Sequence, residues 1–256
     1  MTKKEEKLFI QAIYDEFSLN VKASAKYILG SEKLAEKALV RTFLKVVKHK
    51  NLFMEFDSVE RRRLMAVFSR ASCFDILRRQ KKVKYETDFT VPESEPESEK
   101  RKMADISQLL QKDKFQWFKD TFASFKSPFK EICIMKFYFK MPTTKVKDVL
   151  GLKASQVNSI LGSRLAKLKS QTESYLGGEL EPAELGMALG LAGKKCADED
   201  LSALENSDIS RVSLSAETFA KVNGYLSFRQ ILPLFFGICG GIIALAILIF
   251  CLIIFL

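Results

Sequence analysis

The stretch from residue 143 to 169, TTKVKDVLGLKASQVNSILGSRLAKLK, constrains the fold most, because apolar residues recur at helical spacing on both sides of a central glycine. On the N-terminal side they fall at i, i+3 and i+4, and they are Val146, Val149 and Leu150. Gly151 can end this helix in the left-handed conformation, and Leu152 follows as an apolar plug of the turn. The stretch therefore predicts two helices joined by a tight turn.

The second helix of this pair is predicted to bury one stripe and expose the other. The buried stripe is Val157, Ile160 or Leu161, Leu165 and Leu168. Thr143 or Thr144 can cap the first helix and Ser155 the second, because each side-chain oxygen can accept from free backbone amides. Two helices at this spacing form a helix-turn-helix, which presents its second helix to a DNA groove. An ordinary helical hairpin is the alternative interpretation.

The charge balance indicates an anionic partner. Lysine and arginine total 41 against 31 aspartate and glutamate residues, so the formal net charge is +10. This predicts binding to nucleic acid or to a membrane surface, and charge alone does not separate the two.

Residues for catalysis or metal binding form no pattern. The five cysteines are scattered without zinc-ligand spacing, and no nucleophile elbow or phosphate loop is present. The single histidine, His49, lies between two lysines and is predicted to be a solvated helix-end residue. We therefore predict a binding protein rather than an enzyme, without a cofactor and without a metal.

The first part of the chain reads as three further amphipathic helices, at about 8–29, 32–49 and 58–82. Gly30 can end the first, and Ser31 can cap the second. Basic residues gather at both ends of the third.

Two regions of the chain resemble the conserved parts of a known family. AKYILGSEKLAEKALVRTFLKVVKHKNLF, followed by LMAVFSRASCFDILRRQKK, is similar to region 2 of bacterial RNA polymerase sigma factors of the extracytoplasmic-function type. The helix-turn-helix, preceded by FASFKSPFKEICIMKFYF, resembles their region 4. The resemblance covers about 8–82 and 122–172, in the order that the family has, and it implies that the chain binds RNA polymerase core and promoter DNA.

The resemblance places a polymerase-binding surface on the second helix. The matching residues are Glu36, Lys37, Arg41, Thr42 and Phe43. The chain departs from the family at Leu34 and Lys37, where aspartate is usual, and at Arg41, where glutamate is usual. These departures motivate an alternative function in which polymerase is not recruited.

The resemblance also places DNA contacts on two helices. The promoter-opening helix would use Arg70, Phe74, Arg78, Arg79, Lys81 and Lys82. The cations can contact phosphates, whereas Phe74 can either stack on an unpaired base or pack in the core. The recognition helix would use Ser155, Gln156, Asn158, Ser159, Ser163, Arg164 and Lys167.

Composition divides the chain into five segments. The predicted divisions are a region 2-like helical domain at 1–85, an acidic flexible linker at 86–103, a region 4-like helix-turn-helix domain at 104–176, a juxtamembrane spacer at 177–230, and a transmembrane helix at 231–256. The linker contains prolines and many acidic residues, and the spacer is rich in small residues and only patchily periodic. We predict that the spacer is mostly flexible, with short helices.

The last segment, ILPLFFGICGGIIALAILIFCLIIFL, carries no charge. A helix that rises about 1.5 Å per residue over this length exceeds the bilayer core of about 30 Å. Arg229 and the basic body before it favour a cytoplasmic N-terminal portion. The segment predicts a single-pass location in the cell membrane.

The function hypothesis combines these patterns. We predict an all-α protein of two small helical domains plus a C-terminal transmembrane helix, acting as a membrane-tethered sigma-like transcription initiation factor. Its expected partners are RNA polymerase core, promoter DNA and the membrane, and an anti-sigma or other regulatory protein is a further candidate. The alternatives are a membrane-bound helix-turn-helix regulator that does not recruit polymerase, and a sigma-like decoy that sequesters a partner.

Overall fold

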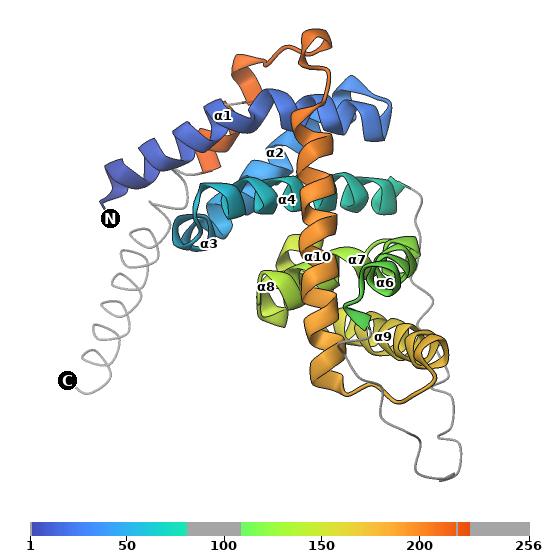
Figure 1. The fold of residues 1–256 in the computed structure, drawn as a ribbon. Coiled ribbons are helices and arrows are strands. Elements are labelled where there is room, and N and C mark those ends of the chain that lie inside the picture. Colours follow the sequence, from blue (N-terminus) through green and yellow to red (C-terminus); the bar gives the residue numbers. More distant parts are fainter. Residues whose placement is uncertain (1, 81–108, 219, 226–256) are drawn as a thin grey trace, which may run out of the picture.

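The computed structural model describes residues 2–80, 109–218 and 220–225, and all elements assigned there are helices (Figure 1). In chain order they are α1 (Lys3–Leu29), α2 (Glu32–Lys48), α3 (Lys50–Glu55), α4 (Ser58–Gln80), α6 (Lys112–Ser124), α7 (Phe129–Cys133), the π-helix η1 (Ile134–Tyr138), α8 (Thr143–Leu150), α9 (Ala154–Leu176), α10 (Pro182–Glu205) and the 3₁₀-helix η2 (Ile209–Arg211). Figure 1 shows α10 crossing α4 in the middle of the molecule, with α1 on one side of the crossing and α6 to α9 on the other.

Local signals set most helix ends in the first part of the chain as predicted. Gly30 ends α1 in the left-handed conformation (φ 65°), and the side chain of Ser31 accepts from the backbone N–H of Leu34 at the start of α2. Gly151 ends α8 in the same left-handed conformation (φ 63°), and Leu152 is buried behind it. The predicted helix–glycine–helix unit is confirmed.

The predicted caps of α8 and α9 are wrong. Pro142 precedes α8 without a side-chain cap, and Thr143 instead accepts from Lys136 Nζ at 2.9 Å. Lys153 precedes α9, and its backbone N–H donates to Gln156 Oε1 at 2.9 Å. Ser155 therefore lies inside the first turn of α9 and does not cap it.

The prediction that 177–230 is a mostly flexible spacer is wrong for residues 182–205, which form the long helix α10. Its glycines lower helix propensity, which made the segment look flexible, but they permit close packing on η1. A Cβ atom at Gly190 would lie 3.2 Å from the carbonyl oxygen of Phe137, and one at Gly193 would lie 3.4 Å from Tyr138 Cβ. Packing against η1, α4 and α1 thus makes a 24-residue helix from a weakly periodic sequence.

One apolar cluster runs through both predicted modules and through α10. Phe68 of α4, Phe118 of α6 and Leu189 of α10 are fully buried members of it. His49 is also buried and forms a T-shaped ring pair with Phe68, so the predicted solvated histidine is wrong. The shared core fixes the two predicted modules against each other.

The predicted fold class needs one correction. The described residues are all-helical, but none of their helices has the length and apolar character needed to cross a membrane. The predicted transmembrane helix at 231–256 lies outside the described residues, as does the predicted linker at 86–103. The fold is therefore a helical assembly without a transmembrane helix among its described elements.

Candidate nucleic-acid interface

The helix α9 presents polar side chains along the surface opposite its buried stripe. Val157, Ile160 and Leu168 face the core, as predicted. The predicted contact residues divide by exposure: Ser155, Asn158, Ser159 and Lys167 are exposed, whereas Gln156, Ser163 and Arg164 are half-buried. The exposed amide, hydroxyls and ammonium are the groups that this helix can offer to base edges and phosphates.

Two of the half-buried residues are engaged within the helix itself. Gln156 Oε1 accepts from the backbone N–H of Lys153 at 2.9 Å. Ser163 Oγ donates to the carbonyl oxygen of Ser159 at 2.9 Å. Ser155, Asn158, Ser159 and Lys167 are therefore the predicted contact residues of α9 whose side chains are exposed.

The C-terminal end of α4 lies beside the turn between α8 and α9. Arg78 Nη2 donates to the carbonyl oxygen of Gly151 at 2.9 Å, and also to Asp75 Oδ1 at 2.6 Å. Arg79 Nε donates to the same carboxylate oxygen at 3.0 Å, with 59 % of its side chain exposed. The structure thus brings two predicted promoter-opening cations against the helix-turn-helix, while Lys81 and Lys82 lie outside the described residues.

Asp75 organises these arginines. Its carboxylate also accepts from Arg41 Nη1 of α2 at 2.9 Å. Burial alone would raise the pKa of Asp75, but hydrogen bonds from Arg78 and Arg79 and the charges of Arg79 and Arg41 outweigh burial and lower it. Three guanidinium groups therefore share one carboxylate, and the group keeps excess positive charge.

Arg70 and Phe74 lie apart from this end of α4. Arg70 donates to Glu131 Oε1 at 3.3 Å and to Asp200 Oδ1 at 2.8 Å, and its guanidinium also covers the ring of Phe74 at 5.2 Å. The structure thus uses Arg70 to join α4 to α7 and α10. It is an internal ion-pair residue here, and Phe74 is half-buried beneath it.

The predicted polymerase-binding residues are mostly turned inward. Thr42 and Phe43 are fully buried, and Thr42 Oγ1 donates to the carbonyl oxygen of Ala38 at 2.8 Å. Arg41 is paired with Asp75, whereas Lys37 is exposed on α2. Arg41, which stands where the resembled family usually has glutamate, therefore forms an internal ion pair with Asp75.

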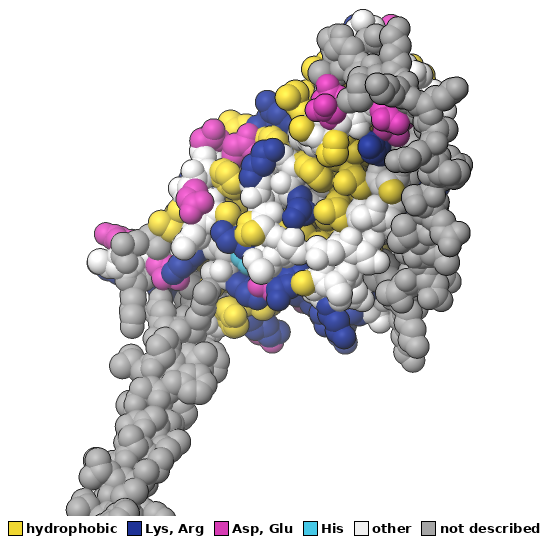
Figure 2. Space-filling model, turned by 90° about the horizontal axis from the view of Figure 1, so that it is seen from below, with side chains coloured by type: hydrophobic (Ala, Val, Ile, Leu, Met, Phe, Trp, Pro, Cys, Tyr) yellow, Lys and Arg dark blue, Asp and Glu magenta, His cyan; other side chains and the backbone are white. Residues whose placement is uncertain are grey.

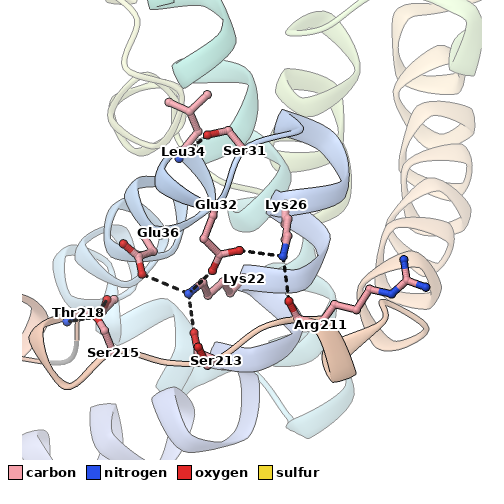
Figure 3. A network of polar contacts seen from close by, with 10 residues as sticks. All are labelled: Lys22, Lys26, Ser31, Glu32, Leu34, Glu36, Arg211, Ser213, Ser215 and Thr218. Carbon is pink, nitrogen blue, oxygen red and sulfur yellow. Dashed lines mark hydrogen bonds and ion pairs between the residues drawn. The ribbon is translucent and has the colours of Figure 1, made fainter.

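Glu36, the remaining predicted polymerase contact, belongs to a network around the buried Lys22 (Figure 3). Lys22 Nζ lies 2.6 Å from Glu32 Oε1 and 3.2 Å from Glu36 Oε1, and it donates to the carbonyl oxygen of Ser213 at 2.5 Å. Burial lowers the pKa of Lys22, but the hydrogen bonds and charges of Glu32 and Glu36 more than compensate, so that it is raised. The network fastens the segment after α10 onto α1 and α2.

Sequence reasoning missed Lys45, which lies on the same face of α2 as Arg41 and Lys48. The three occupy positions i, i+4 and i+7, a spacing that already places like charges together. This stripe is the signal that could have identified a basic site on α2. Figure 2 shows several lysine and arginine side chains along the lower edge of the visible face, while others are mixed with acidic and hydrophobic side chains.

Among the described residues, no group of three or more His, Cys, Asp or Glu side chains could hold a metal ion. The three described cysteines, Cys73, Cys133 and Cys196, are buried thiols. Comparison with protein-family models finds no match, and comparison with curated proteins finds none either. A proposal for the function therefore rests on the geometry of the site and on the sequence.

Proposed function

We propose that this protein is a helix-turn-helix DNA-binding transcription factor whose DNA surface joins α9 to the C-terminal end of α4. One observation carries the proposal: Arg78 of α4 donates to the carbonyl oxygen of Gly151, in the turn that sets α9 in place. The cations expected to hold phosphates therefore lie beside the helix expected to read bases.

The roles follow from the exposed groups. Asn158 and Ser159 can hydrogen-bond to base edges, because their amide and hydroxyl lie on the exposed side of α9. Lys167 and Arg79 keep their charged ends at the surface and would bind phosphates, which fixes the register without reading sequence.

The sigma-like hypothesis predicts binding to both DNA and polymerase, and the contacts in the structure support the polymerase part less than the DNA part. Thr42 and Phe43 are core residues, and Glu36 and Arg41 hold internal ion pairs. These contacts favour a regulator that binds DNA without recruiting polymerase over an initiation factor that docks on it. Polymerase binding stays a prediction, and a pull-down of core enzyme by the full chain separates the two.

Selection of the full chain against a random-sequence duplex pool tests the DNA proposal. We expect enrichment of a short motif, and Asn158→Ala should lower discrimination at one base pair by about 1–3 kcal/mol. Lys167→Ala should weaken binding to all duplexes alike. The matched control is Gln171→Ala, an exposed amide farther along α9, which should change neither. Failure of the wild-type chain to retain any duplex at low salt would overturn the proposal.

A further inference from the structure

A cavity of about 230 Å³ opens between α2, α4 and α8, next to the proposed DNA surface. Its lining is rich in charge and is made by Arg41, Leu44, Lys45, Lys48, Asp75, Arg79, Asp148, Gly151 and Tyr225. Four of these residues are basic and two are acidic. We call it the α2–α4–α8 cavity.

Both carboxylates of this cavity are already engaged. Asp75 accepts from Arg41, Arg78 and Arg79. Asp148 Oδ2 lies 2.9 Å from Lys48 Nζ. Both acids are already paired, and four basic residues face two acidic ones, so the lining keeps a net positive charge.

Lys45 is the basic residue of the lining that neither Asp75 nor Asp148 engages in an ion pair. Its side chain is half-buried, but its Nζ is fully enclosed and has no hydrogen-bond partner among the described residues. The pKa of Lys45 is lowered to about 8, because burial and the charge of Arg41, which lower it, outweigh the charge of Asp75, which raises it. A buried ammonium without a partner is costly, and an anion beside it would remove that cost.

We propose that the α2–α4–α8 cavity binds one phosphate group, held by Arg41, Arg79 and Lys48 and stabilised by the charge of Lys45. Arginine suits this role because its planar donors match phosphate oxygens. The phosphate can come from the DNA backbone, in which case this site rests on the proposed function and anchors the duplex beside α9, or from a free phosphate-bearing molecule.

The first arm of the test titrates the full chain with inorganic phosphate and measures heat and thermal stability in phosphate-free buffer. We expect saturable binding that raises Tm. Lys45→Met should weaken it roughly tenfold or more, because the positive charge that stabilises the bound phosphate is lost. Lys33→Met, an exposed lysine on the same helix, is the matched control and should leave binding unchanged.

The pH profile gives a readout that a structural role would not produce. Phosphate affinity should fall as pH rises past about 8, because Lys45 loses its proton there. The charged or titratable groups that act on Lys45 are Arg41 of α2 and Cys73, Asp75 and Arg79 of α4. Burial raises the pKa of the Cys73 thiol to about 12, well above this range. Lys48→Gln is a second variant that should weaken binding without abolishing the pH dependence.

The second arm measures duplex binding by anisotropy across a salt series. If the phosphate belongs to DNA, Lys45→Met should weaken all duplexes and reduce the salt slope by about one. If the ligand is a free phosphate, DNA binding should stay unchanged while phosphate binding is lost. Absence of phosphate binding together with an unchanged salt slope would overturn the site. Phosphate binding without any DNA binding would overturn only the proposed function.

Discussion

Two groups of arginines, one on α4 and one shared by the end of α4 and Arg41 of α2, have opposite surroundings. Toward α10, Arg63 pairs with Glu60 and Asp198, and Arg70 pairs with Glu131 and Asp200, so each arginine has two carboxylates. At the C-terminal end of α4 one carboxylate, Asp75, serves three arginines. The same residue type therefore has a structural role on one face of the helix and leaves positive charge for a ligand on the other.

The pKa values of the two buried aspartates, Asp75 and Asp200, shift in opposite directions because of these surroundings. Burial raises the pKa of Asp200, and the charges of Arg70 and Lys130 offset it only in part because Glu131 lies nearby. The pKa of Asp75 is lowered, since three arginines outweigh its burial. The comparison teaches that the local ratio of acids to bases decides which cations remain for a partner.

The largest effect on this comparison is expected from Asp75→Asn. The substitution leaves three arginines without their shared carboxylate, and removing one partner of a buried ion pair costs about 3–5 kcal/mol. Urea denaturation at pH 7 measures the loss. Asp120→Asn, at an exposed carboxylate of α6, is the control and should change stability by less than about 0.5 kcal/mol.

The pH dependence of this loss has a definite sign. A lowered pKa means that Asp75 stabilises the fold above its ordinary value of 3.8 and that this contribution is lost as pH falls through the folded pKa. The gap between wild type and Asp75→Asn should therefore close in acid. A gap that is constant from pH 7 to pH 2 would contradict the ion-pair account.

The next effect concerns the packing that brings α10 onto α4 and η1. Gly193→Leu would push side-chain atoms into Tyr138 and Ile134 and should cost about 1–3 kcal/mol. Gly162→Ala is the matched control in α9, because a Cβ there meets nothing within 4 Å, and it should raise stability by about 0.5–1 kcal/mol. Equal effects of the two substitutions in urea denaturation would contradict the close contact of α10.

A smaller effect is expected from Asp200→Asn, because burial already disfavours its charged form. We expect a loss of about 1–2 kcal/mol at pH 7. The raised pKa gives the opposite sign to Asp75: the pH-dependent part of the contribution of Asp200 is fully present below 3.8 and is lost as pH rises through the folded pKa, whereas the hydrogen bond from Arg70 remains at pH 7. The gap between wild type and this variant should thus widen in acid. If the stability gap from wild type changed with pH in the same direction for both aspartate variants, the opposite pKa shifts of Asp75 and Asp200 would be contradicted.

The smallest effect is expected at an ion pair between α6 and α10. Lys119 Nζ lies 2.8 Å from Glu199 Oε1, whose side chain is 55 % exposed. Glu199→Gln should cost less than about 1 kcal/mol, because solvent screens the pair, and salt should reduce the difference further. Urea denaturation at low and high salt measures it. A loss as large as that of Asp200→Asn would show that burial does not separate these acids.

Much of the helical order could be predicted from the sequence, whereas the partners of the charged residues could not. The spacing of apolar residues and the glycines at 30 and 151 predicted α1, α2, α4, α8 and α9. Arg70, predicted to contact DNA, proved to be an internal ion-pair residue, and the buried Lys45 went unnoticed. The difference arises because Arg70 meets carboxylates 61 and 130 positions away in the chain.

By itself, the sequence determined the approximate extent of α1, α2, α4, α8 and α9 and which face of each is apolar, because these properties depend mainly on residues within about four positions. Only the tertiary structure decided that α10 is a central helix, that Thr42 and Phe43 are core residues, and that Asp75 must serve three arginines. Burial and ion pairing depend on which distant segments pack together, and only the folded chain defines those neighbours.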